Sequence, residues 1–306
     1  MQNRYLDERT ARDIDTRITK ILNDLDNPEP PLRLEHVREL LKLDFGFYSS
    51  SNTGAIAETI HRLKVAGKQV ISRPSLLIDA IKKWQLKALW VPDRKRILLD
   101  SELPPAKQRW GEAHEIGHSV LPWHDAVMHG DMKRTLSLAC EEQVESEANF
   151  AAGRLLFLQD AFVEHVRSSP LTFESVKSLS KVFGNTITST LWRAVESTDI
   201  AAFGMVSQHP KHEMSSEPLR YFVRSKKFCD LFPGVSAMQV FKVLQTFCFG
   251  NRGPIGKSDI CFVDLSGTEH VFFVEAFFNS HETLTLGVYR RTKVSSFPQG
   301  GKTHYS

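Results

Sequence analysis

The sequence predicts an α+β protein with a mostly helical N-terminal part that carries a small sheet, a short helical segment, and a C-terminal α+β part with an antiparallel sheet. Up to about residue 199, apolar residues recur mainly at three- and four-residue spacing, which is typical of amphipathic helices. From about residue 200, short β-branched and aromatic runs are separated by turn residues, which is typical of strands. The predicted domains are 1–165, 166–199 and 200–306.

The composition of the 306-residue chain is that of a globular protein, with 41% hydrophobic and 25% charged residues. A net charge of +3 at pH 7 is too small to indicate a protein dedicated to nucleic acid. The N-terminus is charged, and no apolar run approaches the ~18 residues of a membrane span, so we expect a cytoplasmic protein with no membrane segment. The cysteines form no C-x-x-C pair, and we expect free thiols at Cys140, Cys229, Cys248 and Cys261.

The first hundred residues predict helical scaffold and one hairpin. Apolar stripes predict helices at 6–26 and 34–41, separated by a proline-rich connector, and a short strand at 44–48. A loop and a helix to about residue 63 should follow, and then a helix at 74–84. Two apolar runs flank the turn residues Pro92-Asp93-Arg94, which predicts a β-hairpin at 88–99.

The most specific feature is an H-E-x-x-H sequence at His114–His118, within an apolar-periodic segment at 105–121. Residues four apart on a helix share a face, so His114 and His118 should point the same way, one turn apart. Two neutral imidazoles at that separation can hold one zinc ion. Glu115, between them, is placed to take a proton from the water that the metal activates. The alternative is an ordinary amphipathic helix with two surface histidines.

A zinc site needs a third protein ligand and keeps a fourth position for water. One candidate is His124, six residues after His118, which is the metzincin spacing. That pattern has glycine at the position of Leu121, where a sharp turn favours a residue without a side chain. The alternative is that His124 is an ordinary polar residue just past the end of a helix.

The other candidate is Glu145, in an acidic run that leads into a helix. Small residues share its face at Ala148 and Ala152, so this helix could approach the first one closely, which is the gluzincin arrangement. Asn149, one turn later, could hold the carboxylate of Glu145. Glu147 is the nearest competing carboxylate in the sequence, but it lies two residues further along the helix than Glu145 and therefore on another face. A solvated helix start would explain the other acids of this run.

Two runs together resemble the ImmA/IrrE family of zinc metallopeptidases. They are RWGEAHEIGH at 109–118 and ESEANFAAGRLL at 145–156. Trp110 and Phe150 lie at or close to aromatic positions of that family, whereas Phe157-Leu158 stands where the family usually has proline. The wider pattern extends the likeness from about residue 30 to 200.

The resemblance implies a zincin-like fold, with one zinc ion held by His114, His118 and Glu145 and with Glu115 as the catalytic base. It implies an endopeptidase whose substrate is a regulatory protein, most often a helix-turn-helix repressor, cut to release a stress or mobile-element response. It also suggests that a strand just before the motif, at Ile97–Asp100, offers its edge to the substrate. Either His124 or His129 could stabilise the developing oxyanion.

Residues 172–196 predict two helices with a turn at Gly184-Asn185, the outline of a helix-turn-helix. The second helix offers threonines, serine and Arg193 but little positive charge, so packing or partner docking is favoured over DNA reading. A non-cleaving regulator or anti-repressor, which binds a partner or DNA through the same fold, is therefore the alternative function.

The resemblance to the ImmA/IrrE family suggests a sensor-like or regulatory domain for the last hundred residues, which show no phosphate loop or cofactor motif. We expect a surface loop at 209–213 rather than a second metal site, and a frayed tail from residue 292. Strands are predicted at 202–208, 220–223, 259–264, 270–277 and 283–289, with a helix at 238–247.

Overall fold

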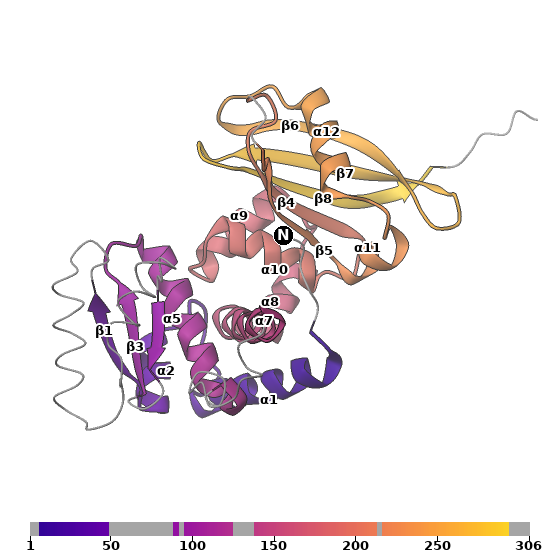
Figure 1. The fold of residues 1–306 in the computed structure, drawn as a ribbon. Helices are drawn as coiled ribbons and strands as arrows, with labels where there is room; N and C mark the ends of the chain where they lie inside the picture. Colours follow the sequence, from indigo (N-terminus) through magenta and orange to yellow (C-terminus); the bar gives the residue numbers. More distant parts are fainter. Residues whose placement is uncertain (1–5, 49–87, 92–94, 125–137, 213–215, 294–306) are drawn as a thin grey trace, which may run out of the picture. The chain divides into compact units, whose positions relative to one another are not determined.

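The computed structural model describes residues 6–48, 88–91, 95–124, 138–212 and 216–293 (Figure 1). They form a mixture of helices and sheets, so the predicted α+β class is confirmed. The chain divides into two compact units, one from residues 4–165 and 178–186 and the other from residues 1–3, 166–177 and 187–306. The domain bounds proposed from the sequence stay a prediction, and the helices expected near 63 and at 74–84 lie outside the described residues.

Two helices open the first unit where the apolar stripes predict them. Helix α1 spans Glu8–Asp24 and α2 spans Leu34–Leu41. The carboxylate of Asp7 caps α1 by accepting hydrogen bonds from two backbone amides of its first turn, which have no partner within the helix. The isoleucines of the α1 stripe, Ile14, Ile18 and Ile21, are buried.

The small sheet of the first unit has the strand order β1-β3-β2. Strands β2 (Ala88–Val91) and β3 (Arg96–Asp100) pair antiparallel, which confirms the hairpin. Strand β1 (Asp44–Tyr48) pairs in parallel with the other side of β3. The expectation that Ile97–Asp100 offers a free edge is therefore wrong, because both sides of this central strand are already paired. The open edges of this described sheet belong to β1 and β2.

Three further helices complete the first unit and begin the link to the second. Helix α5 spans Pro105–Val120, α7 spans Leu138–Leu156 and α8 spans Asp160–Arg167. Helix α1 packs on α7, and Arg154 of α7 forms an ion pair with Asp15 of α1.

Helices α9 (Phe173–Val182) and α10 (Ile187–Ser197) confirm the predicted helix-turn-helix outline. Gly184 in the turn has a φ of +64°, a left-handed conformation that favours glycine just after a helix end. All residues of α10 are described and none is exposed, with Thr190 completely buried. The expectation that this segment does not read DNA stays a prediction.

The second unit contains a five-stranded antiparallel sheet in the order β5-β4-β8-β7-β6 (Figure 1). The strands are β4 (Ala202–Ser207), β5 (Leu219–Arg224), β6 (Gly253–Val263), β7 (Glu269–Phe278) and β8 (Thr283–Thr292). The predicted strands are thus present, and β6 begins six residues before its predicted start. The helices α11 (Lys226–Leu231) and α12 (Ala237–Phe247) accompany the sheet.

Successive side chains of a strand point to opposite faces, and β4 is buried on both. Phe203 packs into an aromatic cluster with Phe228 and Phe272 on the face covered by α12. The next residue, Gly204, faces Leu191 of α10 on the other face. The sheet is therefore covered on both sides at β4, which explains why the β4 sequence is apolar without alternation.

The sequence missed α8 and α11, which are only eight and six residues long and too short for a clear periodicity. The loop expected at 209–213 is not wholly a surface loop. His209 is 2% exposed, and its Nε2 donates a hydrogen bond to the carbonyl oxygen of Gly250. This hydrogen bond gives the buried His209 a structural role in the fold.

Within the described part of the chain, no helix combines the length and the apolar character needed to cross a membrane. The described thiols of Cys229, Cys248 and Cys261 are free, as predicted.

A substitution of Gly287 tests the packing of the second sheet. A Cβ atom at Gly287 would overlap the Phe203 ring, so Gly287→Ala must displace the centre of the aromatic cluster. We expect the free energy of unfolding to fall by about 1–3 kcal/mol in urea titrations. Gly234→Ala is the control, because no atom lies within 4 Å of its Cβ position. Equal stability of the two variants would contradict this packing.

Candidate metal centre

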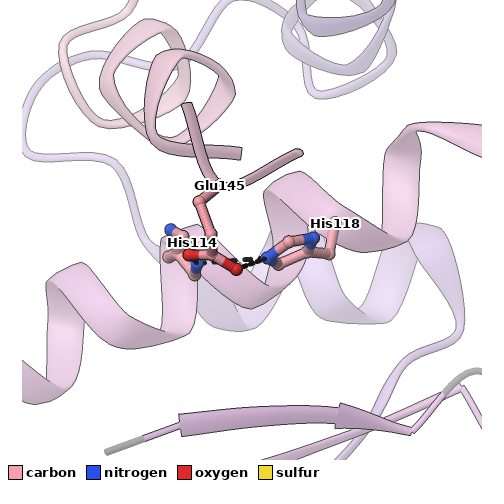
Figure 2. Close-up of side chains that lie close together, drawn as sticks. All are labelled: His114, His118 and Glu145. Atoms are coloured by element: carbon pink, nitrogen blue, oxygen red, sulfur yellow. Dashed lines mark hydrogen bonds and ion pairs between the residues drawn. The ribbon is translucent and has the colours of Figure 1, made fainter. Parts of the chain in front are cut away.

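The site is built on two helices of the first unit. Helix α5 begins with Pro105 at its first position, where proline suits a helix because its missing amide has no intrahelical role. One face of α5 carries His114 and His118, and Glu145 approaches from α7 (Figure 2). His118 is 3% exposed and the side chain of His114 14%, while that of Glu145 is 53% exposed. The group therefore has a buried side and an open side.

Gly117 sets how closely the two helices approach. A Cβ atom at this position would lie 2.8 Å from the carbonyl oxygen of Ala148 and 3.3 Å from the Cβ of Ala151. No larger residue fits without moving α7. On α7, Ala148 and Ala152 are fully buried, and their short side chains also allow the two helices to lie close together.

Three potential ligand atoms converge between the helices. The Nε2 atoms of His114 and His118 lie 3.1 Å apart. The carboxylate of Glu145 lies 3.2 Å from His114 Nε2 through Oε2 and 3.5 Å from His118 Nε2 through Oε1. Among the described residues, this is the group of three potential metal ligands that the structure brings together.

The spacing of these atoms fits a zinc ion. Ligands at zinc distances in a tetrahedral arrangement lie ~3.4 Å from one another. The two Nε2 atoms and the Glu145 oxygen nearest to each are separated by 3.1 to 3.5 Å, and one ligand atom from each residue lies within 4.8 Å of the other two. Two imidazoles and one carboxylate are also a donor set that zinc accepts, with a fourth position left for water.

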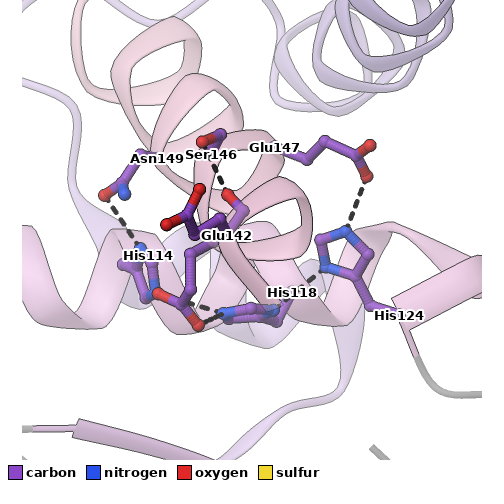
Figure 3. Close-up of polar contacts among 8 residues, drawn as sticks. His114, His118, His124, Glu142, Ser146, Glu147 and Asn149 are labelled. Carbon is purple, nitrogen blue, oxygen red and sulfur yellow. Dashed lines mark hydrogen bonds and ion pairs between the residues drawn. The ribbon is translucent and has the colours of Figure 1, made fainter. Parts of the chain in front are cut away.

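His124 and Glu147, the competing third ligands, lie elsewhere. The chain turns after Leu121 and brings His124 behind His118, where His124 Nδ1 lies 3.0 Å from His118 Nδ1 (Figure 3). His124 therefore contacts the side of the His118 ring that faces away from His114. Glu147 points to the same rear side, and its Oε2 lies 2.9 Å from His124 Nε2. Neither residue reaches the point where the three donors meet.

Asn149 supports a histidine rather than the carboxylate that the sequence suggested. Its Oδ1 lies 3.1 Å from Nδ1 of His114. An amide oxygen accepts, so Nδ1 of His114 carries the proton and Nε2 keeps its lone pair for a metal. The prediction of Asn149 as a partner of Glu145 is thus wrong in its target, because the imidazole of His114 lies nearer to the amide.

His124 does not fit the suggested oxyanion role. It is 0% exposed and both ring nitrogens are engaged, with His118 and with Glu147. A group that stabilises an oxyanion must face the reacting carbonyl, which this ring does not. His129, the other candidate, lies outside the described residues.

The electrostatics of the site follow from the ion pairs. Burial would raise the pKa of Glu145, but its close contacts with the imidazoles of His114 and His118 outweigh it and hold this pKa well below its usual range. Burial would lower the pKa of His114, but the contact with Glu145 and the charge of Glu115 raise it overall. The pKa of His124 is lowered, with burial as the main cause.

Glu115 is 5% exposed, and its charge raises the pKa of the adjacent His114. The catalytic role assigned to it from the sequence remains a prediction.

Sequence reasoning missed the steric role of Gly117 and the outer positions of His124 and Glu147. A glycine in the middle of a strongly predicted helix could have indicated a close approach of backbone. It also missed a partly buried ion pair near the motif, in which Arg38 of α2 lies 2.7 Å from Glu112 of α5. This pair fixes α2 against α5.

Two histidines and a carboxylate on packed helices are the ligand set of the H-E-x-x-H metallopeptidases. Residues 74–190 match the M78 peptidase family, described as the IrrE N-terminal-like domain. This match spans both runs, at 109–118 and 145–156, so their resemblance to the ImmA/IrrE metallopeptidases is confirmed.

A relative from Deinococcus radiodurans, the radiation response metalloprotease IrrE, is 25% identical over 129 residues. The match covers 41% of this chain and 39% of the relative, so the chain matches about two fifths of that protein's length. A solved Mycobacterium tuberculosis transcriptional regulator is similar in fold, with a TM-score of 0.51 at 11% identity. That likeness covers 93% of this chain and 90% of the other.

A substitution of Gly117 tests the contact between the two site helices. In Gly117→Ala the new methyl group would push against the Ala148 carbonyl and separate α5 from α7. We expect weaker zinc binding in chelator competition and a loss of about 1–3 kcal/mol in stability.

The control is Gly153→Ala on α7, whose Cβ position has no atom within 4 Å. Alanine favours a helix over glycine by up to about 1 kcal/mol, so this variant should be as stable as the parent or more so. Unchanged zinc affinity in Gly117→Ala would show that the approach of the helices does not govern the site.

Proposed function

We propose that this chain is a cytoplasmic zinc-dependent endopeptidase of the gluzincin type, with one zinc ion per chain held by His114, His118 and Glu145. The observation that carries the proposal is the convergence of these three residues between α5 and α7, with one ligand atom of each within 4.8 Å of the other two. The match of residues 74–190 to an M78 peptidase domain supports it independently of the geometry.

The histidines are suited to bind through Nε2. In His114 the opposite nitrogen is held by Asn149, and in His118 it is held by His124. Both Nε2 atoms thus face Glu145. When bound, zinc supplies Lewis-acid polarisation of the scissile carbonyl and lowers the pKa of the attacking water.

Glu115 moves the proton in this proposal. Its carboxylate accepts a proton from the attacking water and then delivers it to the amine of the leaving fragment. Glu145 remains a ligand throughout, and its low pKa keeps it ionised.

The substrate in this proposal is a protein, specifically a transcriptional repressor of the helix-turn-helix type. Support comes from the ImmA/IrrE resemblance and from the name of the Deinococcus radiodurans relative, a radiation response metalloprotease. Cleavage of a repressor would release a stress or mobile-element response. An extended substrate segment could pair with an open edge of the small sheet, at β1 or β2.

Removal of the proton carrier tests the proposal. Glu115→Gln keeps the size of the side chain but cannot accept the proton, so we expect cleavage to fall by about 10²- to 10⁴-fold while zinc content stays that of the parent. The measurement incubates each zinc-loaded protein with native cell extract and with a proteome-derived peptide library, and identifies new N-termini by mass spectrometry.

Glu164→Gln, at an exposed position of α8, is the matched control and should cleave like the parent. New N-termini that arise equally with the parent and with Glu115→Gln would contradict the mechanism. A parent that binds zinc and captures a repressor without cutting it would favour the non-cleaving regulator.

A further inference from the structure

A buried chain of hydrogen bonds runs away from the candidate metal centre behind His118 (Figure 3). His118 Nδ1 lies 3.0 Å from His124 Nδ1, and His124 Nε2 lies 2.9 Å from Glu147 Oε2. The three residues are 3%, 0% and 2% exposed. The chain ends in a carboxylate enclosed by protein.

The contacts at the far end of this chain of hydrogen bonds determine which atom of each pair carries the proton. The indole nitrogen of Trp123 donates to Glu147 Oε2, and the amide of Gln143 donates to Oε1 from 2.8 Å. An indole N–H can only donate, so Glu147 acts as an acceptor. His124 Nε2 therefore carries the proton that it shares with Glu147.

The same reasoning then assigns the protons on the rings of His124 and His118. With its proton on Nε2, a neutral His124 has a lone pair on Nδ1, which accepts from Nδ1 of His118. Nε2 of His118 is left without a proton and directed at Glu145. The opposite direction would put a proton on that Nε2 and prevent it from binding a metal.

We infer that His124 and Glu147 are positioning residues that hold the His118 ring in its metal-binding tautomer and orientation, and so set the zinc affinity without touching the ion. The inference rests on the proposed function, since it presumes zinc at His118. A polar partner on the non-ligating nitrogen of a metal-bound histidine raises its basicity and fixes its ring. Here that partner is a second histidine backed by a carboxylate.

The two histidines of the motif are supported unequally. His114 is held by the single amide of Asn149, which lies on an exposed residue. His118 is held by two further buried side chains. Enclosing an imidazole and a carboxylate costs desolvation free energy that an apolar pair would avoid. A role in orienting His118 explains why the polar pair His124 and Glu147, rather than an apolar pair, lies at this position.

The test is the zinc affinity of the full chain, measured by chelator competition. We expect Glu147→Gln and His124→Ala each to bind zinc about 10- to 100-fold more weakly than the parent. Glu147 acts through His124, so the double variant should bind no more weakly than His124→Ala alone. Glu164→Gln and His36→Ala, at exposed positions of the same unit, are the matched controls and should bind like the parent.

A second measurement separates orientation from simple packing. Glu147→Gln retains size and shape, and its thermal unfolding can be compared with that of the parent. Nitrogen-15 NMR of the zinc-loaded parent should show His118 protonated at Nδ1 and His124 at Nε2. In Glu147→Gln the Nδ1 proton of His118 should exchange faster with solvent, because its acceptor is no longer fixed.

Distinct outcomes overturn the two claims. Zinc binding that depends on His118 and Glu145 but is unchanged in His124→Ala and Glu147→Gln would overturn this inference and leave the proposed function standing. Loss of zinc in His124→Ala as complete as in His118→Ala would make His124 a ligand and overturn the positioning role. A parent that binds no zinc would overturn both.

Discussion

The candidate metal centre depends on the close approach of α5 and α7 at Gly117. Two histidines on one helix can supply only part of a zinc site, and the third donor must come from a separate element. The carbonyl oxygen of Ala148 would lie 2.8 Å from any Cβ at Gly117, so the absence of a side chain there is what lets Glu145 reach both imidazoles. The remainder of the first unit holds these two helices in that contact.

That support comes from several directions. Helix α1 packs against α7 through an ion pair between Asp15 and Arg154, and α2 is fixed to α5 by Arg38 and Glu112. Around the donors, each histidine has its second nitrogen engaged, so ring orientation does not depend on the metal alone. A site arranged before binding loses less conformational entropy when the ion arrives, which favours tight retention.

Local sequence pattern predicted most elements and much of the site. The four-residue spacing placed His114 and His118 on one face of a helix, and the family resemblance selected Glu145 over His124 as the third donor. The parallel pairing of β1 with β3 was not predictable, because it joins segments about fifty residues apart and leaves no mark on local periodicity. Side-chain targets also escaped prediction: spacing placed Asn149 near the site but could not say which of two polar neighbours its amide contacts.

The same limit explains His124. Its spacing from His118 satisfied a known ligand pattern, yet the turn after Leu121 carries the ring behind His118. Sequence spacing cannot distinguish an inner ligand from an outer partner, since both lie within a few ångströms of the metal. Burial and the identity of the partner on each ring nitrogen make the distinction here.

The most direct test of the account is the metal content of the purified parent beside Glu145→Ala, with Glu164→Ala as the control. We predict about one zinc per chain in the parent and the control, as a two-histidine, one-carboxylate site requires, and loss of zinc in Glu145→Ala. Zinc retained by Glu145→Ala at the parental stoichiometry and affinity would contradict the assignment of the third ligand to α7 at Glu145.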